Sequence, residues 1–482
     1  MKPNPAVLLI VLLALGGVAA VFLTGTKPEM PAVMELKPGS MPIDVANGTA
    51  DDLKKQIVLL QGQIEYLQGQ NDALKDENAE LLHKLGTLGM KNVPAVVMKD
   101  DGVAPDFVGM GLEMMKVRKL QALPMVTTTV SQEEVEKVIL TWLKRQQPNG
   151  EAQKLARGLA ALGWIPEVID PLPLRAGLLV RQLGGWYDAE SETMLTIDPS
   201  TASGSSVSDN EPLGIAFGQL LREYGDTLFQ PQHGPLTTDM RLARESLIAG
   251  DAALTRFLHS VQNPASAPKD DLPPEDPDHP LNQVPAPMFI RDMASFPFSR
   301  GFDFAQTLHS AGNFAQLNAA YSRPPISTAE VIEPEVYLNP ERPAPVEIKL
   351  DDVKLGGVLP FLDDRLGKFV CVTALRMHNE DEKAAEATRG LVADRLLVWA
   401  ADGGAKRDHA AWQTVFMDKS SADAFYNAML NTLQQRYGSK DEAEFAAQGR
   451  FVSLTRNRGA AGVVLIDAAS DDARAALKLL MK

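Results

Sequence analysis

The chain is poor in cysteine and in positive charge, and both shortages exclude classes of site. Its 482 residues include one cysteine, Cys371, so neither an intramolecular disulfide nor a cysteine-based zinc site is possible. Lysine and arginine number 47 against 62 aspartates and glutamates, a formal net charge of −15. Nucleic-acid binders concentrate basic residues, so this balance argues against a nucleic-acid partner and for an acidic solvated surface.

Familiar catalytic motifs are also missing. The chain has no nucleophile elbow, no Walker loop and no GxGxxG after a predicted strand. Cys371 lies in an apolar run, which favours a core residue over a nucleophile. None of the seven histidines has a second histidine three to five residues away, so a zinc site would need distant histidines. They are His83, His233, His259, His279, His309, His378 and His409. We therefore expect no cofactor and no bound metal.

One long apolar run lies near the N-terminus. Residues 6–23 are 18 uncharged, mostly apolar residues that follow Lys2. About 20 such residues span a bilayer core, so residues 1–24 are predicted to be a single-pass anchor in a bacterial inner membrane. Lys2 places the N-terminus inside and the bulk of the chain in the periplasm or outside the cell. A cleaved signal peptide is the alternative, because residues 17–20 are small enough for a cleavage site.

A heptad pattern follows the irregular linker predicted for residues 25–50. Over residues 51–86, leucines at 53, 60, 67, 74 and 81 take position d, and Leu85 extends position a. Isoleucine at a with leucine at d favours two parallel strands, and asparagine at a fixes the register. We therefore predict a parallel homodimer through residues 53–85, whose seam includes Ile57, Ile64, Asn71 and Asn78. One amphipathic helix packed on its own domain is the alternative.

The remaining chain predicts an α+β protein. After a connecting segment, 87–130, a mainly helical domain is expected over 131–347 and a smaller α/β domain over 348–482. Helices are predicted from Ser131 and over 152–162, 211–229, 239–262, 299–321 and 420–437, and strands over 369–376, 395–400 and 412–416. Loops are predicted at 201–210 and 263–287, and the proline-rich segment 322–347 is expected to follow the surface.

Four segments follow one another in an order that is typical of one family. They are residues 182–195, the helix 211–229, the stretch 243–252 and the stretch 312–338. Together they resemble exported bacterial zinc metallopeptidases that carry an HExxH helix, over roughly residues 150–435. The resemblance implies a zincin-like fold for 131–347. It also implies a cleft beside Gln182, Gly185, Tyr187, Asp188, Gly250, Asp251, Tyr321 and Pro325.

The residues that match the family's zinc site are not metal ligands. HExxH places two imidazoles on one helix face with a general base between them. One alignment puts Phe217, Gly218 and Leu221 in these places, and the other puts Gly218, Gln219 and Arg222 there. Ala249 takes the place of the third ligand, and Glu333 replaces a family histidine.

Other polar residues near this site have structural explanations. We expect Asp251 to bind backbone or an arginine such as Arg244, and Arg222 to pair with Glu223 or Asp251. Trp186 and Tyr187 are expected to be core residues, and Asp226, Glu223 and Glu245 to be structural.

The sequence therefore predicts a membrane-anchored, metallopeptidase-like pseudoenzyme of the cell envelope. It would act in binding or scaffolding, with a peptide or protein partner in the former active cleft. A hydrolase with an atypical metal or carboxylate site is the first alternative, and a purely structural envelope protein is the second.

Overall fold

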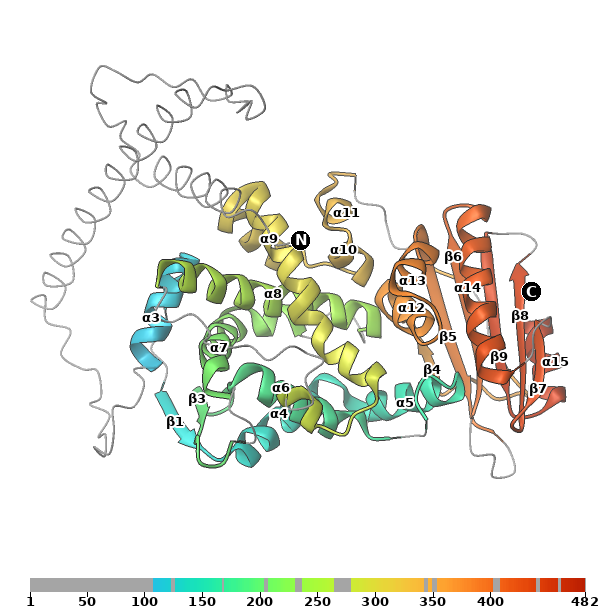
Figure 1. Cartoon of the computed structure of the whole chain (residues 1–482), viewed down its shortest axis with the longest axis horizontal. Helices are drawn as coiled ribbons and strands as arrows, with labels where there is room; N and C mark the ends of the chain where they lie inside the picture. Colours follow the sequence, from blue (N-terminus) through green and yellow to red (C-terminus); the bar gives the residue numbers. More distant parts are fainter. Residues whose placement is uncertain are drawn as a thin grey trace, which may run out of the picture. The chain divides into compact units, whose positions relative to one another are not determined.

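The computed structural model describes the chain from residue 107 onward, with short gaps (Figure 1). The described ranges are 107–122, 126–166, 169–202, 207–229, 236–263, 279–341, 346–348, 353–401, 408–438, 443–457 and 461–481. They belong to one unit that begins at Ala104. The predicted anchor and coiled coil lie outside the described residues. Among the described residues, no helix is long and apolar enough to cross a membrane.

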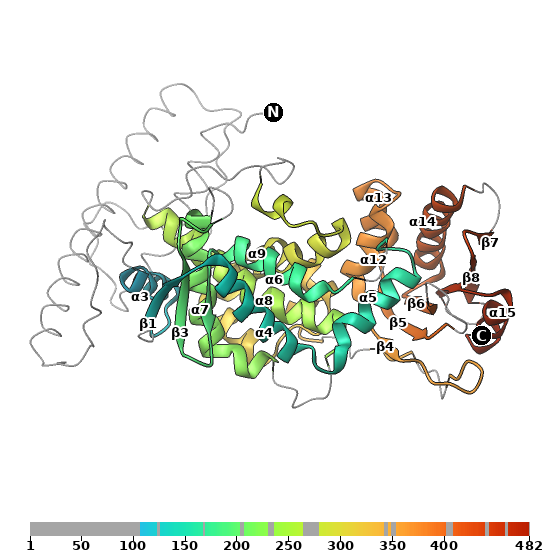
Figure 2. The same cartoon turned by 90° about the horizontal axis from the view of Figure 1, so that it is seen from below.

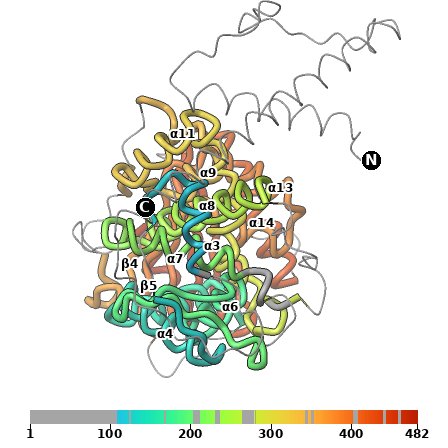
Figure 3. The backbone as a smooth tube through the Cα atoms, turned by 90° about the vertical axis from the view of Figure 1, so that its left-hand side faces the viewer, coloured from blue at the N-terminus to red at the C-terminus, as the bar shows by residue number. Residues whose placement is uncertain are grey.

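The first part of this unit is mainly helical, as predicted. Its helices are α3 (Phe107–Arg118), α4 (Gln132–Gln146), α5 (Glu151–Ala161), α6 (Pro171–Leu183), α7 (Val207–Phe229), α8 (Thr238–Gln262), α9 (Met288–Ser322), α10 (Thr328–Ile332) and α11 (Pro334–Leu338). Helix α8 is central, because it packs against both α7 and α9. Helix α3 lies across α7 and α8 at one end of this helical part (Figure 3).

Capping side chains explain where several helices begin. Ser131 and Glu134 form a capping box at the start of α4, which confirms the predicted start. Asp170 and Thr237 accept from backbone nitrogens at the starts of α6 and α8. Gly163, with φ of +70°, follows the end of α5, as predicted.

A small sheet forms one side of the helical part. Its strands are β1 (Val126–Val130), β2 (Gly185–Asp188) and β3 (Thr193–Ile197), in the order β1-β3-β2. Strands β2 and β3 form an antiparallel hairpin, and β1 runs parallel to β3. Within the segment 182–195 of the resemblance, the residues from Gly185 onward form this hairpin, whereas Gln182 still belongs to α6.

The C-terminal part is built on a six-stranded sheet (Figures 1 and 2). The strands are β4 (Leu362–Asp364), β5 (Leu391–Trp399), β6 (His409–Phe416), β7 (Glu444–Ala447), β8 (Arg450–Asn457) and β9 (Gly462–Ala468), in the order β4-β5-β6-β9-β8-β7. All neighbours are antiparallel, so this part is α+β rather than the predicted α/β.

Both faces of this sheet are buried. Residues such as Leu396, Trp412 and Leu465 join the core shared with the helical part. Their sequence neighbours Leu397, Ala411 and Val464 face a second core under α15 (Asp471–Leu480). The alternation follows from the two-residue period of a strand. Helices α12 (Gly367–Arg376), α13 (Asp381–Ala387) and α14 (Lys419–Tyr437) complete the C-terminal part.

Helix α5 joins the helical part to the sheet. A Cβ atom on Gly158 would come within 3.1–3.2 Å of three side chains of β4 and β5, so glycine favours this close approach. The Arg157 guanidinium binds both oxygens of Asp408, at 2.7 and 2.9 Å. The two parts of the described chain are therefore fixed to each other at this point.

One predicted strand is wrong. Residues 369–376 form most of α12, and Cys371 is a fully buried core residue of that helix. The segment is apolar on nearly every side because it packs between the sheet and the helical part, and such a run has no period that separates helix from strand. The strands predicted at 395–400 and 412–416 and the helix at 420–437 are confirmed.

Several predicted boundaries also change. The loop predicted at 201–210 ends early, because α7 begins at Val207. The helix predicted at 299–321 begins at Met288, with a kink at Gly312 and Asn313. Within the loop predicted at 263–287, Pro280–Gln283 form a short 3-10 helix.

Candidate functional site

Helices α7 and α8 each contribute to one pocket a residue that the resemblance assigns to the lost zinc site. Phe217 of α7 and Ala249 of α8 both line it, together with Trp142, Trp186 and Phe298. Its empty volume is about 310 Å³, counting the open space at its mouth. We call this the aromatic pocket. Two positions that the sequence places 32 residues apart therefore do face one another.

An aromatic ring cluster surrounds Phe217. Its ring centroid lies 5.6 Å from that of Trp186 and 6.2 Å from that of Phe298. Trp142 packs edge-on against Trp186 at 5.2 Å. These separations are typical of favourable aromatic pairs. The site is therefore suited to an apolar or aromatic group.

The next residues of α7 point elsewhere. A Cβ atom on Gly218 would lie 2.9 Å from Tyr187 Cβ and 3.1 Å from Met194 Sδ, so glycine lets α7 approach the β2–β3 hairpin. Arg222, one turn later, lies 3.6 Å from Glu192 in the turn of that hairpin. Gln219 and Leu221 are buried. Of the residues in the two alignments, only Phe217 lines the aromatic pocket with Ala249.

A buried ion pair forms one wall of the aromatic pocket. Arg175 Nη2 of α6 donates to Glu245 Oε2 of α8 at 2.8 Å, and each side chain is only 10% exposed. Glu245 was expected to be structural, and its partner Arg175 was not foreseen. The only feature of the sequence that points to Arg175 is that it is one of two charged residues in the otherwise mostly apolar stretch 171–183.

Asp251 lies in a separate buried network. Arg118 of α3 binds both its oxygens, at 2.7 and 2.8 Å, and both side chains are fully buried. The Tyr321 hydroxyl donates to Asp251 Oδ2 at 3.0 Å, and its ring stacks on that of Tyr224 at 3.7 Å. Two segments of the resemblance, around Asp251 and Tyr321, are therefore in direct contact.

This network corrects the expected partner of Asp251. Arg244 donates instead to the carbonyl of Leu228 at 2.7 Å. Burial alone would lower the pKa of Arg118, but the adjacent Asp251 carboxylate raises it above its usual value. Burial, together with the same carboxylate, raises the pKa of Tyr321 well above its usual value. Arg118 therefore stays charged and Tyr321 neutral.

The other predicted cleft residues support the fold. Asp188 accepts hydrogen bonds from the backbone of Glu190 and Ser191 and closes the hairpin turn. A Cβ atom on Gly185 would lie 2.8 Å from the Leu195 carbonyl oxygen. Tyr187 is a buried core residue, as expected, and burial raises the pKa of its hydroxyl. Its neighbour Trp186 is also buried but lines the aromatic pocket.

Three further residues of the resemblance do not line the aromatic pocket. Gly250 of α8 crosses Gly301 of α9 so closely that a Cβ atom would lie 1.9 Å from the Gly301 carbonyl oxygen. Pro325 is buried just before α10. Gln182 is half-buried at the end of α6.

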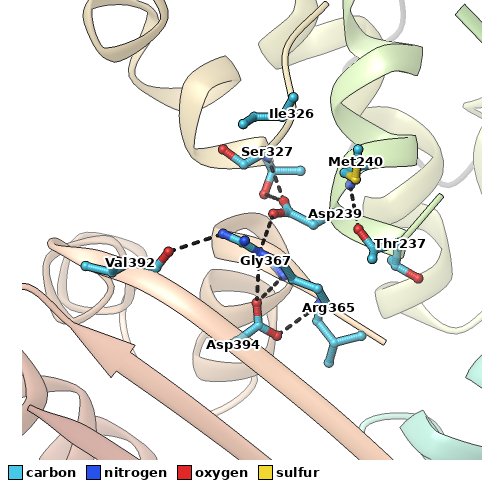
Figure 4. Close-up of polar contacts among 12 residues, drawn as sticks. Thr237, Asp239, Met240, Ile326, Ser327, Arg365, Gly367, Val392 and Asp394 are labelled. Carbon is cyan, nitrogen blue, oxygen red and sulfur yellow. Dashed lines mark hydrogen bonds and ion pairs between the residues drawn. The ribbon is translucent and has the colours of Figure 1, made fainter. Parts of the chain in front are cut away.

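A second group of carboxylates is buried where the helical part meets the sheet (Figure 4). Asp239 of α8 accepts from the backbone nitrogen and hydroxyl of Thr328, each at 2.7 Å. Asp394 of β5 accepts from the backbone nitrogens of Leu366 and Gly367, at 2.8 and 2.9 Å. The Arg365 Nε atom lies 3.3 Å from Asp239 Oδ2 and 4.0 Å from Asp394 Oδ1.

Burial raises the pKa of each carboxyl in this group. The pKa of Asp239 rises to about 6, mainly through burial, although Arg365 opposes the rise. Burial also raises the pKa of Asp364 to about 6 and that of Asp394 above its usual value. No sequence motif marked these residues, because each lies far along the chain from its partners.

Metal-binding side chains are scattered. Within the part of the chain that the structure describes, no three His, Cys, Asp or Glu side chains are grouped so that they could hold a metal ion. His259 lies 3.4 Å from Glu113, and the ring nitrogens of His279 and His409 accept from backbone nitrogens. Burial raises the pKa of the Cys371 thiol well above its usual value, so the thiol stays protonated.

Comparisons of the chain with protein-family models, with curated proteins and with solved structures found no match. The resemblance to exported zinc metallopeptidases therefore stays a prediction from the residues. The structure has a mostly apolar pocket, with an ion pair in its wall, at the position where the resemblance would place the lost zinc site.

Proposed function

We propose that this protein is a metallopeptidase-like binding protein of the bacterial cell envelope, which uses the aromatic pocket to hold an apolar side chain of a peptide or partner segment. One observation carries the proposal. Phe217 and Ala249, in the places of two zinc ligands, lie together in a pocket walled by Trp142, Trp186 and Phe298. Pockets that bind ligands are mostly apolar and aromatic with few polar groups, and the Arg175–Glu245 pair supplies those polar groups.

The membrane anchor and the coiled coil belong to the same proposal. An anchor through residues 6–23 would hold the pocket at the inner membrane, with the bulk of the chain outside the cytoplasm. A parallel dimer through residues 53–85 would present two pockets, and two linked sites bind a repetitive partner more tightly than one. Scaffolding is then a consequence of binding.

Peptide binding to the full chain in detergent micelles tests the proposal. The probes are acetylated, amidated heptapeptides of alanine and glycine with one central phenylalanine, leucine or aspartate. We expect saturable binding of the phenylalanine or leucine peptide and none of the aspartate peptide. Fluorescence can report it, because Trp142 and Trp186, two of the five tryptophans, lie at the pocket.

A matched pair of variants localises the binding. Phe298→Ala removes one wall of the pocket and should weaken binding roughly tenfold or more. Phe302→Ala, one turn further along α9 and also half-buried, packs against Phe257 and should bind like the natural chain. Equal binding by both variants would contradict the proposal. Peptide cleavage that is lost in Gln219 or Arg222 variants would instead favour the hydrolase.

A further inference from the structure

We infer that a second pocket, which shares only Arg175 with the aromatic pocket, binds a short aliphatic carboxylate. The pocket lies between α5, α6, α8 and α9, with an empty volume of about 490 Å³ including the space at its mouth. Its walls are mostly aliphatic: Leu155, Leu159, Leu172, Leu242, Ile290 and Met293. Of these six, only Leu155 is more than slightly exposed, so the pocket is largely shielded from water. We call it the aliphatic pocket.

Two polar groups that line the aliphatic pocket lack partners. Gln147 Nε2 and Arg175 Nε are buried and have no hydrogen-bond partner among the described residues. Both residues are 8% exposed, so bulk water does not satisfy them. A buried donor without a partner costs about 1–3 kcal/mol, and native structures leave few of them. Two such donors in one pocket therefore point to an absent acceptor.

The chemistry of these donors selects the ligand. Both are N–H groups, so a ligand oxygen that only accepts fits them better than a hydroxyl or a water, whose own hydrogens need acceptors.

Charge favours a carboxylate over a neutral carbonyl. Arg175 and Arg241 both line the pocket, and no aspartate or glutamate does. Their acidic partners, Glu245 and Glu151, bind their guanidinium groups at 2.8 and 3.0 Å. An anionic oxygen near the Arg175 Nε donor would make a charge-assisted hydrogen bond. The aliphatic walls would hold the attached hydrocarbon chain.

Equilibrium dialysis of radiolabelled hexanoate against the full chain in micelles tests this site, with empty micelles as the blank. We expect saturable uptake of one hexanoate per chain, and binding of 1-hexanol at least tenfold weaker, since the alcohol loses the charge-assisted bond. No saturable uptake above the blank would overturn the inference, as would hexanol bound as tightly as hexanoate.

Three variants place the site. Gln147→Leu keeps the side-chain size and removes one donor, so hexanoate affinity should fall roughly tenfold. Ala156→Leu fills the pocket and should abolish uptake. Gln306→Leu, an exposed glutamine of α9, should bind like the natural chain. Thermal melting confirms that each variant is folded, and unchanged hexanoate affinity in both folded pocket variants would overturn the inference.

Failure of this site can be separated from failure of the proposed function. Gln147 and Ala156 do not line the aromatic pocket. Peptide binding in Gln147→Leu should therefore match the natural chain, whatever hexanoate does.

Discussion

Asp364 accepts hydrogen bonds from the backbone nitrogen and the hydroxyl of Thr238, at 2.9 and 2.6 Å, and from the backbone nitrogen of Arg365 at 2.7 Å. Burial nevertheless raises its pKa from the usual 3.8 to about 6. Folding therefore takes up a proton between these values. The stabilising contribution is complete below about pH 4 and is lost as the pH rises through about 6. The same sign holds for Asp239, whose pKa is also about 6.

Asp364→Asn tests this sign. Asparagine resembles the protonated carboxyl and can still accept from the two backbone nitrogens and donate to the Thr238 hydroxyl. At pH 7.5 we expect the free energy of unfolding to be equal to or about 1–2 kcal/mol above that of the natural chain, less than the full two-unit shift implies because Asp364 is only half-buried. The gain should shrink toward pH 4.5 in urea titrations of the full chain.

Asp363→Asn is the matched control for this prediction. Asp363 is an exposed neighbour that pairs with Arg395 at 2.7 Å. An exposed pair contributes about 0–1 kcal/mol, so this variant should lose little stability and keep the natural pH dependence. A lower stability of Asp364→Asn at pH 7.5 than at pH 4.5, relative to the natural chain, would reverse the predicted sign.

At the scale of elements, the crossing of α8 and α9 is set by two glycines. Gly250 and Gly301 allow backbone contact between the helices, and this contact aligns Ala249 with the aromatic pocket on one side and Asp251 with Arg118 on the other. A larger residue would push the helices apart. The pocket and the buried ion pair would then be disturbed together.

Gly250→Ala should therefore be strongly destabilising, by about 3 kcal/mol, because its Cβ atom meets backbone rather than a movable side chain. Urea unfolding of the full chain, followed by tryptophan fluorescence, measures the loss. Gly111→Ala on α3 is the control, since its Cβ atom would lie 3.4 Å from the nearest Ile215 atom. Helix propensity favours alanine there by up to about 1 kcal/mol, so stability should change little or rise. Similar losses in both variants would show that the crossing is not the cause.

At the scale of the whole molecule, residues 51–86 are predicted to set the oligomeric state. Deletion of this segment should convert the full chain from a dimer to a monomer, because the heptad seam is the predicted dimer contact. Size-exclusion chromatography with light scattering in micelles measures the mass. Gly62→Ala is the control, since this outer heptad position should keep the dimer while raising helix propensity. A dimeric deletion variant, or a monomeric natural chain, would contradict the prediction.

Function can be tested at the same scale. If the deletion variant remains monomeric and still restores function in a cell that lacks the natural chain, the purely structural envelope role fails. Peptide binding by that monomer would then identify the pocket as the functional part.

Much of the secondary structure could be predicted from local patterns in the sequence. The capping box at Ser131 and Glu134, the glycine at 163 and the long amphipathic helices depend on residues close in the chain, so their predictions are confirmed. Phe217 and Ala249, which the resemblance would place in the lost zinc site, both line the aromatic pocket. Burial of Cys371 followed from its apolar neighbours in the chain.

Only the tertiary structure decided the rest, because long-range partners have no local signal. Residues 369–376 became a helix once packed on both sides, against a local preference for strand. Asp251 forms an ion pair with Arg118, 133 residues away in the sequence, rather than with the nearby Arg244. The unpartnered donors of Gln147 and Arg175 exist only because four helices enclose them. The partners of a charged or hydrogen-bonding group are fixed by which residues are neighbours in the folded protein. Residues far apart in the sequence can be such neighbours, so local sequence patterns do not reveal these pairs.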